Sequence, residues 1–369
     1  MTLSFFFDPL YSIPIIGTIV LCSSLSLIGA LMYVQKQCLI GETLSHSAYP
    51  GVIMGCCLAA LFAEQASAMA NIIILAGALL TAAVGYKSVA FLKNKLCIHS
   101  DAALCLILSF SLGIGVLCSS YIQLAIPTWY RYSLIYLFGQ IVTISTMHVW
   151  LLLGLLIAIV SCVLFKYREI ELMTFDFSLG QQLKNMGGSS LSTAILLLLV
   201  CSIILGIRCF GVVLIAGVLI APAASARCFA DRFSSFLILS VLFGVLSGFF
   251  GAMLSVFFSF KNIIIPFGPT VLMLSISLTL ISLFFAPKKG IFFLKMRKYR
   301  FKRQCDFENI LKSLWKAGRT QSHKPVDIWS INKMGKIRFY RSLFFLSKEG
   351  WIAKNQSGNI SLTQDGIQR

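Results

Sequence analysis

The feature that most constrains this fold is a change of composition at Pro287. Residues 1–287 are dominated by long runs of Leu, Ile, Val and Phe and contain only 12 Lys and Arg and 8 Asp and Glu. The last 82 residues contain 19 Lys and Arg and 5 Asp and Glu, so most of the net charge of +18 lies there. We therefore predict a membrane domain over 1–287, a basic linker over 288–304 and a small water-exposed domain over 305–369.

The apolar runs are continuous and do not alternate with polar residues, which favours helices over a β-barrel, because each backbone polar group must be paired within the bilayer. The predicted fold is an all-α polytopic membrane protein with about nine transmembrane helices and a small C-terminal winged helix-turn-helix domain. The spans are expected near 13–34, 45–63, 67–86, 101–120, 149–165, 191–207, 211–226, 234–259 and 268–286. The segment 134–146 is too short to span and is expected to form a partial or re-entrant helix.

The loop charges predict the orientation of the chain in the membrane. One set of loops carries nine Lys and Arg residues and the other set carries three, so the first set is expected in the cytoplasm. The N-terminus is then outside, with the first span retained, and the C-terminus is inside. The outer loop 121–132 carries Tyr121, Trp129, Tyr130 and Tyr132, which suits an interfacial belt.

Several other residues have predicted structural roles. Asp101 is expected to cap the helix that follows Ser100, and His148 is expected at the outer membrane interface. Gly244 and Gly248 are spaced for close helix packing, which we favour over a hinge role. The twelve cysteines are expected to be small apolar packing residues.

The chemistry-bearing pattern lies between the first two spans, in Leu-Ile-Gly-Glu-Thr-Leu-Ser-His-Ser-Ala-Tyr-Pro-Gly, residues 39–51. Glu42 and His46 are four residues apart, so they share one face of a helix. A carboxylate with an imidazole suits Mn, Fe or Zn, although such a pair also serves as a structural hydrogen bond or helix cap. Pro50 and Gly51 are expected to break or bend the helix just beyond the pair.

This segment resembles the signature of the metal permeases of ATP-binding-cassette transporters, the ABC-3 family of Zn, Mn and Fe importers. Further similarities are Asp101–Cys105 with Gly113-Ile-Gly115, Leu137-Phe-Gly139, the run Gly211–Arg227 and Pro266-Phe-Gly-Pro269, so the resemblance covers about 10–290. The resemblance implies a bacterial inner-membrane importer in which Glu42 and His46 line the metal path, with Glu42 where many members have Asp. It implies no permanently bound cofactor, a second permease subunit, an extracytoplasmic metal-binding protein and a separate ATPase. The sequence has no Gly-x-x-x-x-Gly-Lys-Ser/Thr phosphate loop, so we do not expect this chain to hydrolyse ATP itself.

The cytoplasmic segment 166–190 mixes charges with turn residues, which suits a short helix on the membrane surface. In the family that it resembles, the matching loop docks into the ATPase, and an ordinary charged connector is the alternative. The coupling residues expected here are Phe175, Asp176, Gly180, Leu183 and Gly187.

The tail after the basic linker is expected to fold as three helices and a hairpin. The predicted helices are 306–316, capped by Asp306, then 326–331 and 333–348, and the hairpin joins Trp351–Lys354 to Ile360–Leu362. On the third helix Ile337, Tyr340, Leu343 and Phe344 are predicted to face inward. The predicted DNA contacts are Lys336, Arg338 and Arg341 on its outer face, together with Lys354.

Residues 346–366 resemble the end of bacterial winged-helix repressors of the diphtheria-toxin-repressor type. The whole arrangement resembles the permease–repressor fusions of chlamydial metal-uptake operons, although here only three residues follow Gly366, where such repressors continue into dimerisation and sensing parts. Operator DNA and anionic lipid are thus expected partners of the tail, and protein contact alone is the rival. A membrane-tethered metal-responsive regulator without transport activity remains the alternative for the whole chain. An intramembrane enzyme is disfavoured because no His-Glu-x-x-His or Gly-x-Ser-x-Gly occurs.

Overall fold

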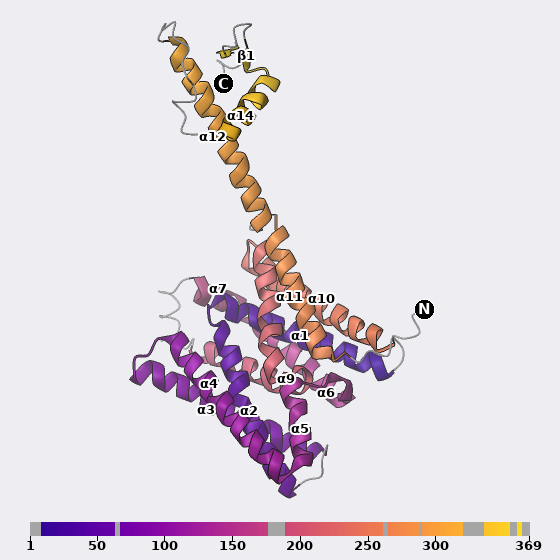
Figure 1. The fold of residues 1–369 in the computed structure, drawn as a ribbon. Coiled ribbons are helices and arrows are strands. Elements are labelled where there is room, and N and C mark those ends of the chain that lie inside the picture. Colours follow the sequence, from indigo (N-terminus) through magenta and orange to yellow (C-terminus); the bar gives the residue numbers. More distant parts are fainter. Residues whose placement is uncertain are drawn as a thin grey trace. The chain divides into compact units, whose positions relative to one another are not determined.

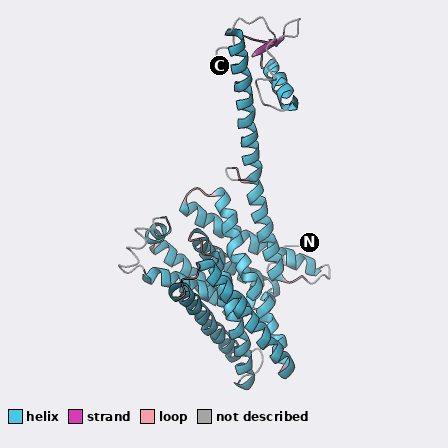
Figure 2. Cartoon of the chain, turned by 60° about the vertical axis from the view of Figure 1, so that its left-hand side comes forward, coloured by secondary structure: helices cyan, strands magenta, loops and turns pink. Residues whose placement is uncertain are grey.

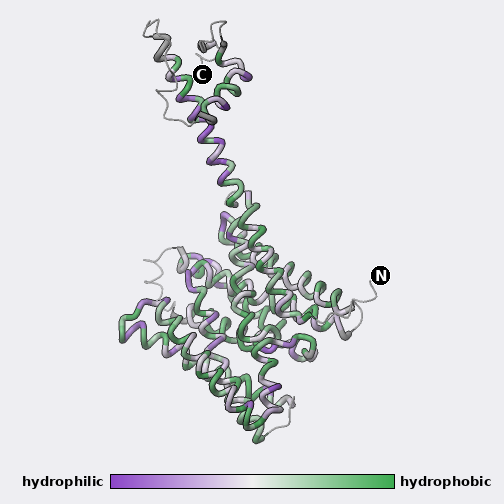
Figure 3. Tube along the Cα trace, in the orientation of Figure 1, coloured by the Kyte–Doolittle hydropathy of each residue, from purple (hydrophilic) through white to green (hydrophobic). Residues whose placement is uncertain are grey.

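The chain folds into two compact units, residues 1–286 and 287–369. In this computed structural model the described residues are 9–62, 67–175, 189–260, 265–287, 290–319, 336–354 and 360–363. Figure 3 shows that apolar residues dominate the helices of the first unit, whereas hydrophilic residues are frequent along the second. Each unit is described by itself.

The first unit is a bundle of helices, drawn from indigo to light orange in Figure 1. Its elements are α1 (Pro9–Val34), α2 (Cys38–Phe62), α3 (Ala68–Lys95), α4 (Ser100–Ala125), α5 (Pro127–Phe138), η2 (Ile141–Thr143), α6 (Thr146–Phe165), α7 (Tyr167–Phe175), α9 (Ser189–Phe229), α10 (Phe233–Phe260) and α11 (Phe267–Phe285).

Eight helices among the described residues are long and apolar enough to cross a membrane, where the sequence predicted about nine. The difference lies in α9, which contains both the sixth and the seventh predicted span. The two halves meet at Gly211, whose backbone angles (φ 80°, ψ 162°) are not helical. Glycine tolerates this conformation because it has no Cβ, so the chain bends sharply without an intervening loop.

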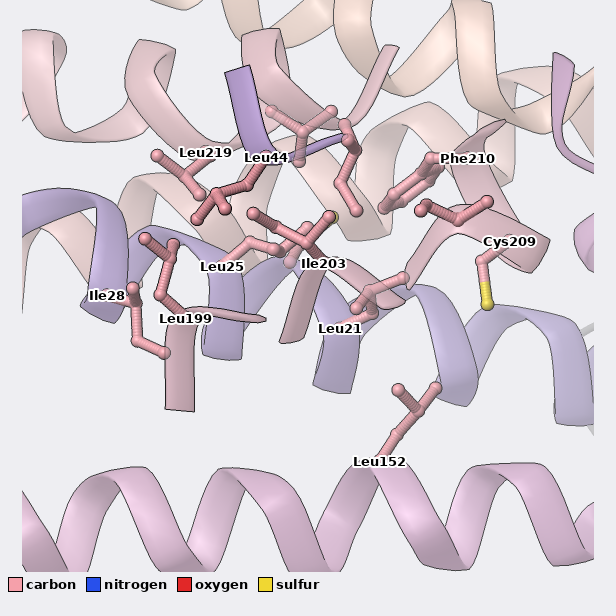
Figure 4. Packing of buried hydrophobic residues seen from close by; sticks show 14 of the residues in the cluster. Leu21, Leu25, Ile28, Leu44, Leu152, Leu199, Ile203, Cys209, Phe210 and Leu219 are labelled. Carbon is pink, nitrogen blue, oxygen red and sulfur yellow. The ribbon is translucent and has the colours of Figure 1, made fainter. Parts of the chain in front are cut away.

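Helix α1 is the most buried of the spans and packs against α6, α9 and α10. Figure 4 shows Leu21, Leu25 and Ile28 of α1 among buried side chains of α2, α6 and α9. A helix that is apolar on all sides is expected to occupy the interior of a membrane protein, as α1 does here.

Helices α2 and α3 approach each other through glycine. A Cβ added at Gly51 would collide with the carbonyl oxygen of Gly77 and the hydroxyl of Thr81, and one added at Gly77 would lie 2.5 Å from the carbonyl oxygen of Gly51. Small residues allow this backbone-to-backbone contact in a bilayer, where close packing drives helix association. The contact fixes α2 against α3 just after Pro50.

The segment 121–132 is not a loop, whereas its place at the outer membrane interface stays a prediction. The segment consists of the end of α4 and most of α5, and Trp129 is only 6% exposed. Pro127 starts α5, because a proline is well accommodated in the first turn of a helix. The short helix predicted within 134–146 corresponds to the end of α5 and the 3₁₀ turn η2.

Three further predictions about single residues in this unit need correction. Asp101 lies in the first turn of α4 and does not cap it, since His99 holds the N-cap position. In that turn its negative charge interacts favourably with the helix dipole. His148 lies in the first turn of α6 and is buried in the bundle, 8% exposed, so it does not face outward from the bundle, while its depth in the membrane stays a prediction. Helix α2 continues through Pro50 to Phe62, so of the predicted break or bend the break is absent.

The second unit contains α12 (Ile291–Arg319), α14 (Lys336–Lys348) and the strands β1 (Ile352–Lys354) and β2 (Ile360–Leu362). Figure 2 shows the two strands as the magenta ribbon that follows α14. The strands are antiparallel, with Ile352 opposite Leu362 and Lys354 opposite Ile360, as the hairpin prediction requires. Gly350 (φ 75°) ends α14, and the Trp351 N–H donates to the Leu346 carbonyl at 3.0 Å.

The predicted cap at Asp306 is wrong, and of the predicted inward residues of α14 whose side chains are described, only Leu343 packs against the core. Asp306 lies in the middle of α12, because the helix already begins at Ile291 and includes most of the predicted linker. On α14 the buried residues are Phe339, Ser342 and Leu346, whereas Tyr340 and Phe344 are each 68% exposed. Apolar residues occur almost all around α14, so the contact with α12 and β1 decides which side is covered. The predicted helix 326–331 lies outside the described residues.

Candidate functional site

The Glu42–His46 segment lies on the second and third turns of α2, which neighbouring helices enclose closely. Every residue of α2 from Thr43 to Ile53 is buried. The Thr43 hydroxyl lies 3.3 Å from the carbonyl oxygen of Leu104 in α4, and the Ser47 hydroxyl lies 3.3 Å from that of Ser111 in the same helix. These polar contacts hold α2 against α4 at the level of the pair.

Helix α9 approaches the same turns of α2 from another direction. A Cβ added at Gly41 would lie 3.5 Å from the methyl groups of Leu219, which is ordinary van der Waals contact. Leu44 and Leu219 lie side by side in Figure 4 and are each 1% exposed. This part of α2 is therefore fixed between α4 and α9, and both site residues are carried on rigid backbone.

The two side chains differ in exposure and in their partners. His46 is only 9% exposed, and its Nδ1 has no hydrogen-bond partner among the described residues. Glu42 is half-buried and lies within electrostatic range of the imidazole. A buried nitrogen without a protein partner is costly because it has lost its water, so this nitrogen is available to bind a water or a metal ion; His148 Nε2 and Ser275 Oγ share this property among the described residues.

Pro50 adds a further acceptor next to this histidine. A proline has no N–H, so the carbonyl oxygen of His46, four residues earlier, lacks its usual helical donor. In His46, the imidazole Nδ1 thus has no hydrogen-bond partner among the described residues, and the carbonyl oxygen lacks its helical N–H partner. Glu42 lies one helical turn before His46, on the same face of α2.

The pair does not form a closed metal site by itself. No group of three or more His, Cys, Asp or Glu side chains gathers within the described ranges. The protein donors of the pair are one imidazole and one carboxylate, and water can complete the coordination. A site with few protein ligands suits an ion that is bound briefly and then released.

The structure places only part of the predicted coupling segment. Phe175 is the last residue of α7, whereas Asp176, Gly180, Leu183 and Gly187 lie outside the described residues. The expected short helix is present as α7, which packs through the buried Ile170.

The predicted DNA contacts are described mainly at the backbone level. Lys336, Arg338 and Arg341 lie on α14, and Lys354 ends β1. Of these four, only the side chain of Arg341 is described: it is exposed and lines a cavity between α14 and α12.

Two contacts within the bundle are not apparent from the sequence. The hydroxyls of Tyr132 and Tyr136 both donate to Oδ1 of Asn71, at 2.7 and 2.9 Å, and tie α5 to α3. Gly139, at the end of α5, meets Gly211 in the bend of α9. An isolated Asn at the start of an apolar run was the available signal for the first feature, whereas the second depends on tertiary contact.

Comparison with known proteins agrees with this architecture. The ABC 3 transport family matches residues 10–286. The chain is 33% identical to a probable metal transport system membrane protein of Chlamydia pneumoniae, over 84% of this chain and 70% of that protein. It is 28% identical to the manganese transport system membrane protein MntC of Bacillus subtilis, over 96% of this chain and 79% of that protein.

The fold also resembles a solved structure, that of PsaBC from Streptococcus pneumoniae in complex with Fab. The TM-score is 0.65 at 23% identity, and the alignment covers 80% of this chain and 100% of that chain. The family match spans the whole helical bundle, including α2 with Glu42 and His46. The chain therefore belongs to the ABC 3 transport family.

Proposed function

We propose that this chain is the permease subunit of an importer that moves a divalent transition-metal ion into the cytoplasm, with Glu42 and His46 as transient ligands. The observation that carries the proposal is the buried Nδ1 of His46, which has no hydrogen-bond partner among the described residues. The carboxylate of Glu42 lies on the same face of α2.

The donor set favours first-row transition metals over the alkaline-earth ions. Imidazole nitrogen binds Mn, Fe and Zn readily, whereas Mg and Ca prefer all-oxygen coordination. We take Mn²⁺ as the first ion to test, because a relative similar over nearly the whole chain is named as a manganese transport protein. Fe²⁺ and Zn²⁺ accept the same ligands.

Transport requires partners beyond this chain. A separate ATPase supplies the energy, an extracytoplasmic metal-binding protein delivers the ion, and a second permease subunit, identical or homologous, completes the path. We assign contact with the ATPase to Phe175, Asp176, Gly180, Leu183 and Gly187, which follow or end α7. The N-terminus faces outward and the tail faces the cytoplasm of a bacterial inner membrane, in keeping with the basic loops.

The decisive experiment is metal accumulation by cells that express His46→Ala together with the partner subunits. We expect accumulation of Mn²⁺ to be lost while the protein remains in the membrane in normal amount. His99→Ala is the matched control, because that imidazole is exposed at the start of α4. Normal uptake by His46→Ala would falsify the assigned path, and loss in both variants would show a general defect.

Glu42→Gln tests the carboxylate separately from the imidazole. The amide retains the size of the side chain and removes its negative charge. We therefore expect uptake to need a higher metal concentration, at an unchanged level of membrane insertion. An unchanged concentration dependence of uptake would remove Glu42 from the path. If neither variant affects uptake while metal still changes expression of a reporter gene, the alternative of a membrane-tethered regulator gains support.

We also propose that the tail is a winged-helix-like domain that binds operator DNA. The supporting observation is the order of α14 and the antiparallel pair β1–β2, which is that of a recognition helix and its wing. Full-length protein in nanodiscs should bind operator-length duplex with an affinity that falls steeply as salt rises. Lys336→Ala and Arg338→Ala should weaken it, and binding that is insensitive to salt and to both substitutions would refute the proposal.

A further inference from the structure

The second unit contains a cationic cavity that metal transport does not explain and that shares only Arg341 with the predicted DNA contacts. The cavity is about 260 Å³ and lies between α12 and α14. Its lining consists of Tyr299, Lys302, Arg303, Asp306 and Phe307 from α12 and Arg341, Ser342 and Phe345 from α14. Three cationic side chains thus converge with one carboxylate, and like charges brought together in a concave site attract a counter-ion.

The position of Arg303 gives this cavity a built geometry. Its guanidinium carbon lies 5.2 Å from the ring centre of Phe307 and 4.7 Å from that of Phe345. Stacking on aromatic rings uses the faces of the guanidinium and leaves its N–H donors in the plane. Those donors form the planar fork that binds a phosphate or carboxylate through two parallel hydrogen bonds.

The floor of the cavity is part of the hydrophobic core of the tail. Phe307 is 9% exposed and belongs to the buried cluster that includes Ile310 and Leu346, and Ser342 is 5% exposed. A ligand held by Lys302 and Arg303 of one helix and Arg341 of the other would therefore join the two helices above their apolar contact.

We propose that this cavity binds the phosphate group of a small molecule no larger than a mononucleotide. The volume lies just below the usual range of pockets for small organic ligands, about 300–1,000 Å³. The aromatic walls offer a stacking surface for a planar ring, and the cationic side chains offer donors for the phosphate oxygens. A concave site between two helices suits such a ligand better than duplex DNA, which is read by elements that protrude into its grooves.

The proposal does not rest on the metal path or on DNA binding, although Arg341 belongs both to the cavity and to the predicted DNA contacts. It predicts that a phosphate-bearing ligand stabilises the contact between α12 and α14. A ligand at about ten times its dissociation constant lowers the opening equilibrium about tenfold, because only the closed form binds it. Amide hydrogen exchange in α14 should slow by the same factor.

The experiment uses the full-length protein in nanodiscs of zwitterionic lipid, with exchange followed by mass spectrometry on peptides from α12 and α14. The additions are inorganic phosphate, adenosine monophosphate, adenosine, and sodium chloride at matched ionic strength. We expect both phosphate-containing additions to slow exchange in α14, with the nucleotide effective at lower concentration if its ring stacks. Adenosine and chloride should have no effect.

Matched substitutions separate the cavity from general surface charge. Arg341→Gln and Lys302→Gln should each raise the phosphate concentration needed to slow exchange about tenfold, because each removes a cation from the lining. Lys348→Gln, on α14, and Lys312→Gln, on α12, should retain it, because neither residue lines the cavity. Exchange of each variant without ligand reports whether α14 still folds, and where Arg341→Gln disturbs it, Lys302→Gln decides.

Three results would overturn the proposal. The first is an equal effect of chloride and phosphate, which would show charge screening alone. The second is an unchanged phosphate effect in both Arg341→Gln and Lys302→Gln. The third is slower exchange with duplex DNA but with neither phosphate nor nucleotide, which would assign these cations to nucleic acid.

Discussion

The junction between Gly139 and Gly211 gives the sharpest stability prediction for the helical bundle. Gly139 (φ 78°) follows α5 and Gly211 (φ 80°) forms the bend of α9. A Cβ at Gly211 would collide with the carbonyl oxygen of Leu137, and one at Gly139 would lie 2.5 Å from that of Cys209. The N–H of Gln140 donates to the carbonyl of Arg208 at 3.0 Å, so a hydrogen bond also joins the chain just after α5 to the bend of α9.

We predict that Gly211→Ala destabilises the bundle by about 2–6 kcal/mol. An alanine held at these backbone angles costs about 1–3 kcal/mol, because the region is almost restricted to glycine. Forcing a methyl group into the contact with α5 costs about another 1–3 kcal/mol, as in an overpacked core. For a domain of this size each kcal/mol corresponds to about 2–4 °C in Tm, so the loss should be at least about 4 °C.

The control is Gly154→Ala, in the middle of α6, where an added Cβ would meet no atom within 4 Å. That substitution should be neutral or should stabilise the helix by about 0.5–1 kcal/mol. The assay is the fraction of detergent-solubilised protein that stays monodisperse in size-exclusion chromatography after heating. Equal Tm values for the two variants would refute the reasoning, because the substitutions differ only in backbone angle and contact.

Two further predictions concern side chains. Tyr136→Phe should lower the stability of the bundle by about 1 kcal/mol, since it removes one of the two hydroxyls that donate to Asn71; the same heating assay measures it, and an unchanged Tm would contradict it. Leu346→Ala should destabilise the tail by about 2–5 kcal/mol, whereas Phe344→Ala, at a 68% exposed position, should be nearly neutral. Limited proteolysis of the tail distinguishes these, and equal susceptibility of the two variants would count against the packing of α14.

The Glu42–His46 pair could be picked out from the sequence because its spacing is local, and the resemblance to the ABC-3 permeases made it the candidate metal site. Glu42 and His46 lie four residues apart in an apolar region, and helix geometry alone puts them on one face. The sequence did not reveal that the imidazole is buried without a hydrogen-bond partner among the described residues. That property depends on α4 and α9, which are distant in sequence from α2.

The sequence alone determined which segments are apolar helices, because length and hydrophobicity are local properties and a bilayer allows few other structures. It also placed the hairpin of the tail, since strand and turn residues are read locally. Tertiary structure decided how the segments join and which side of each is covered. The chain bends at Gly211 within α9 because α5 ends against it. Helix α14 buries its residue Phe339 because α12 and β1 lie on that side. Periodicity cannot supply this information, because helices that are apolar on nearly every face acquire an inside only through their neighbours.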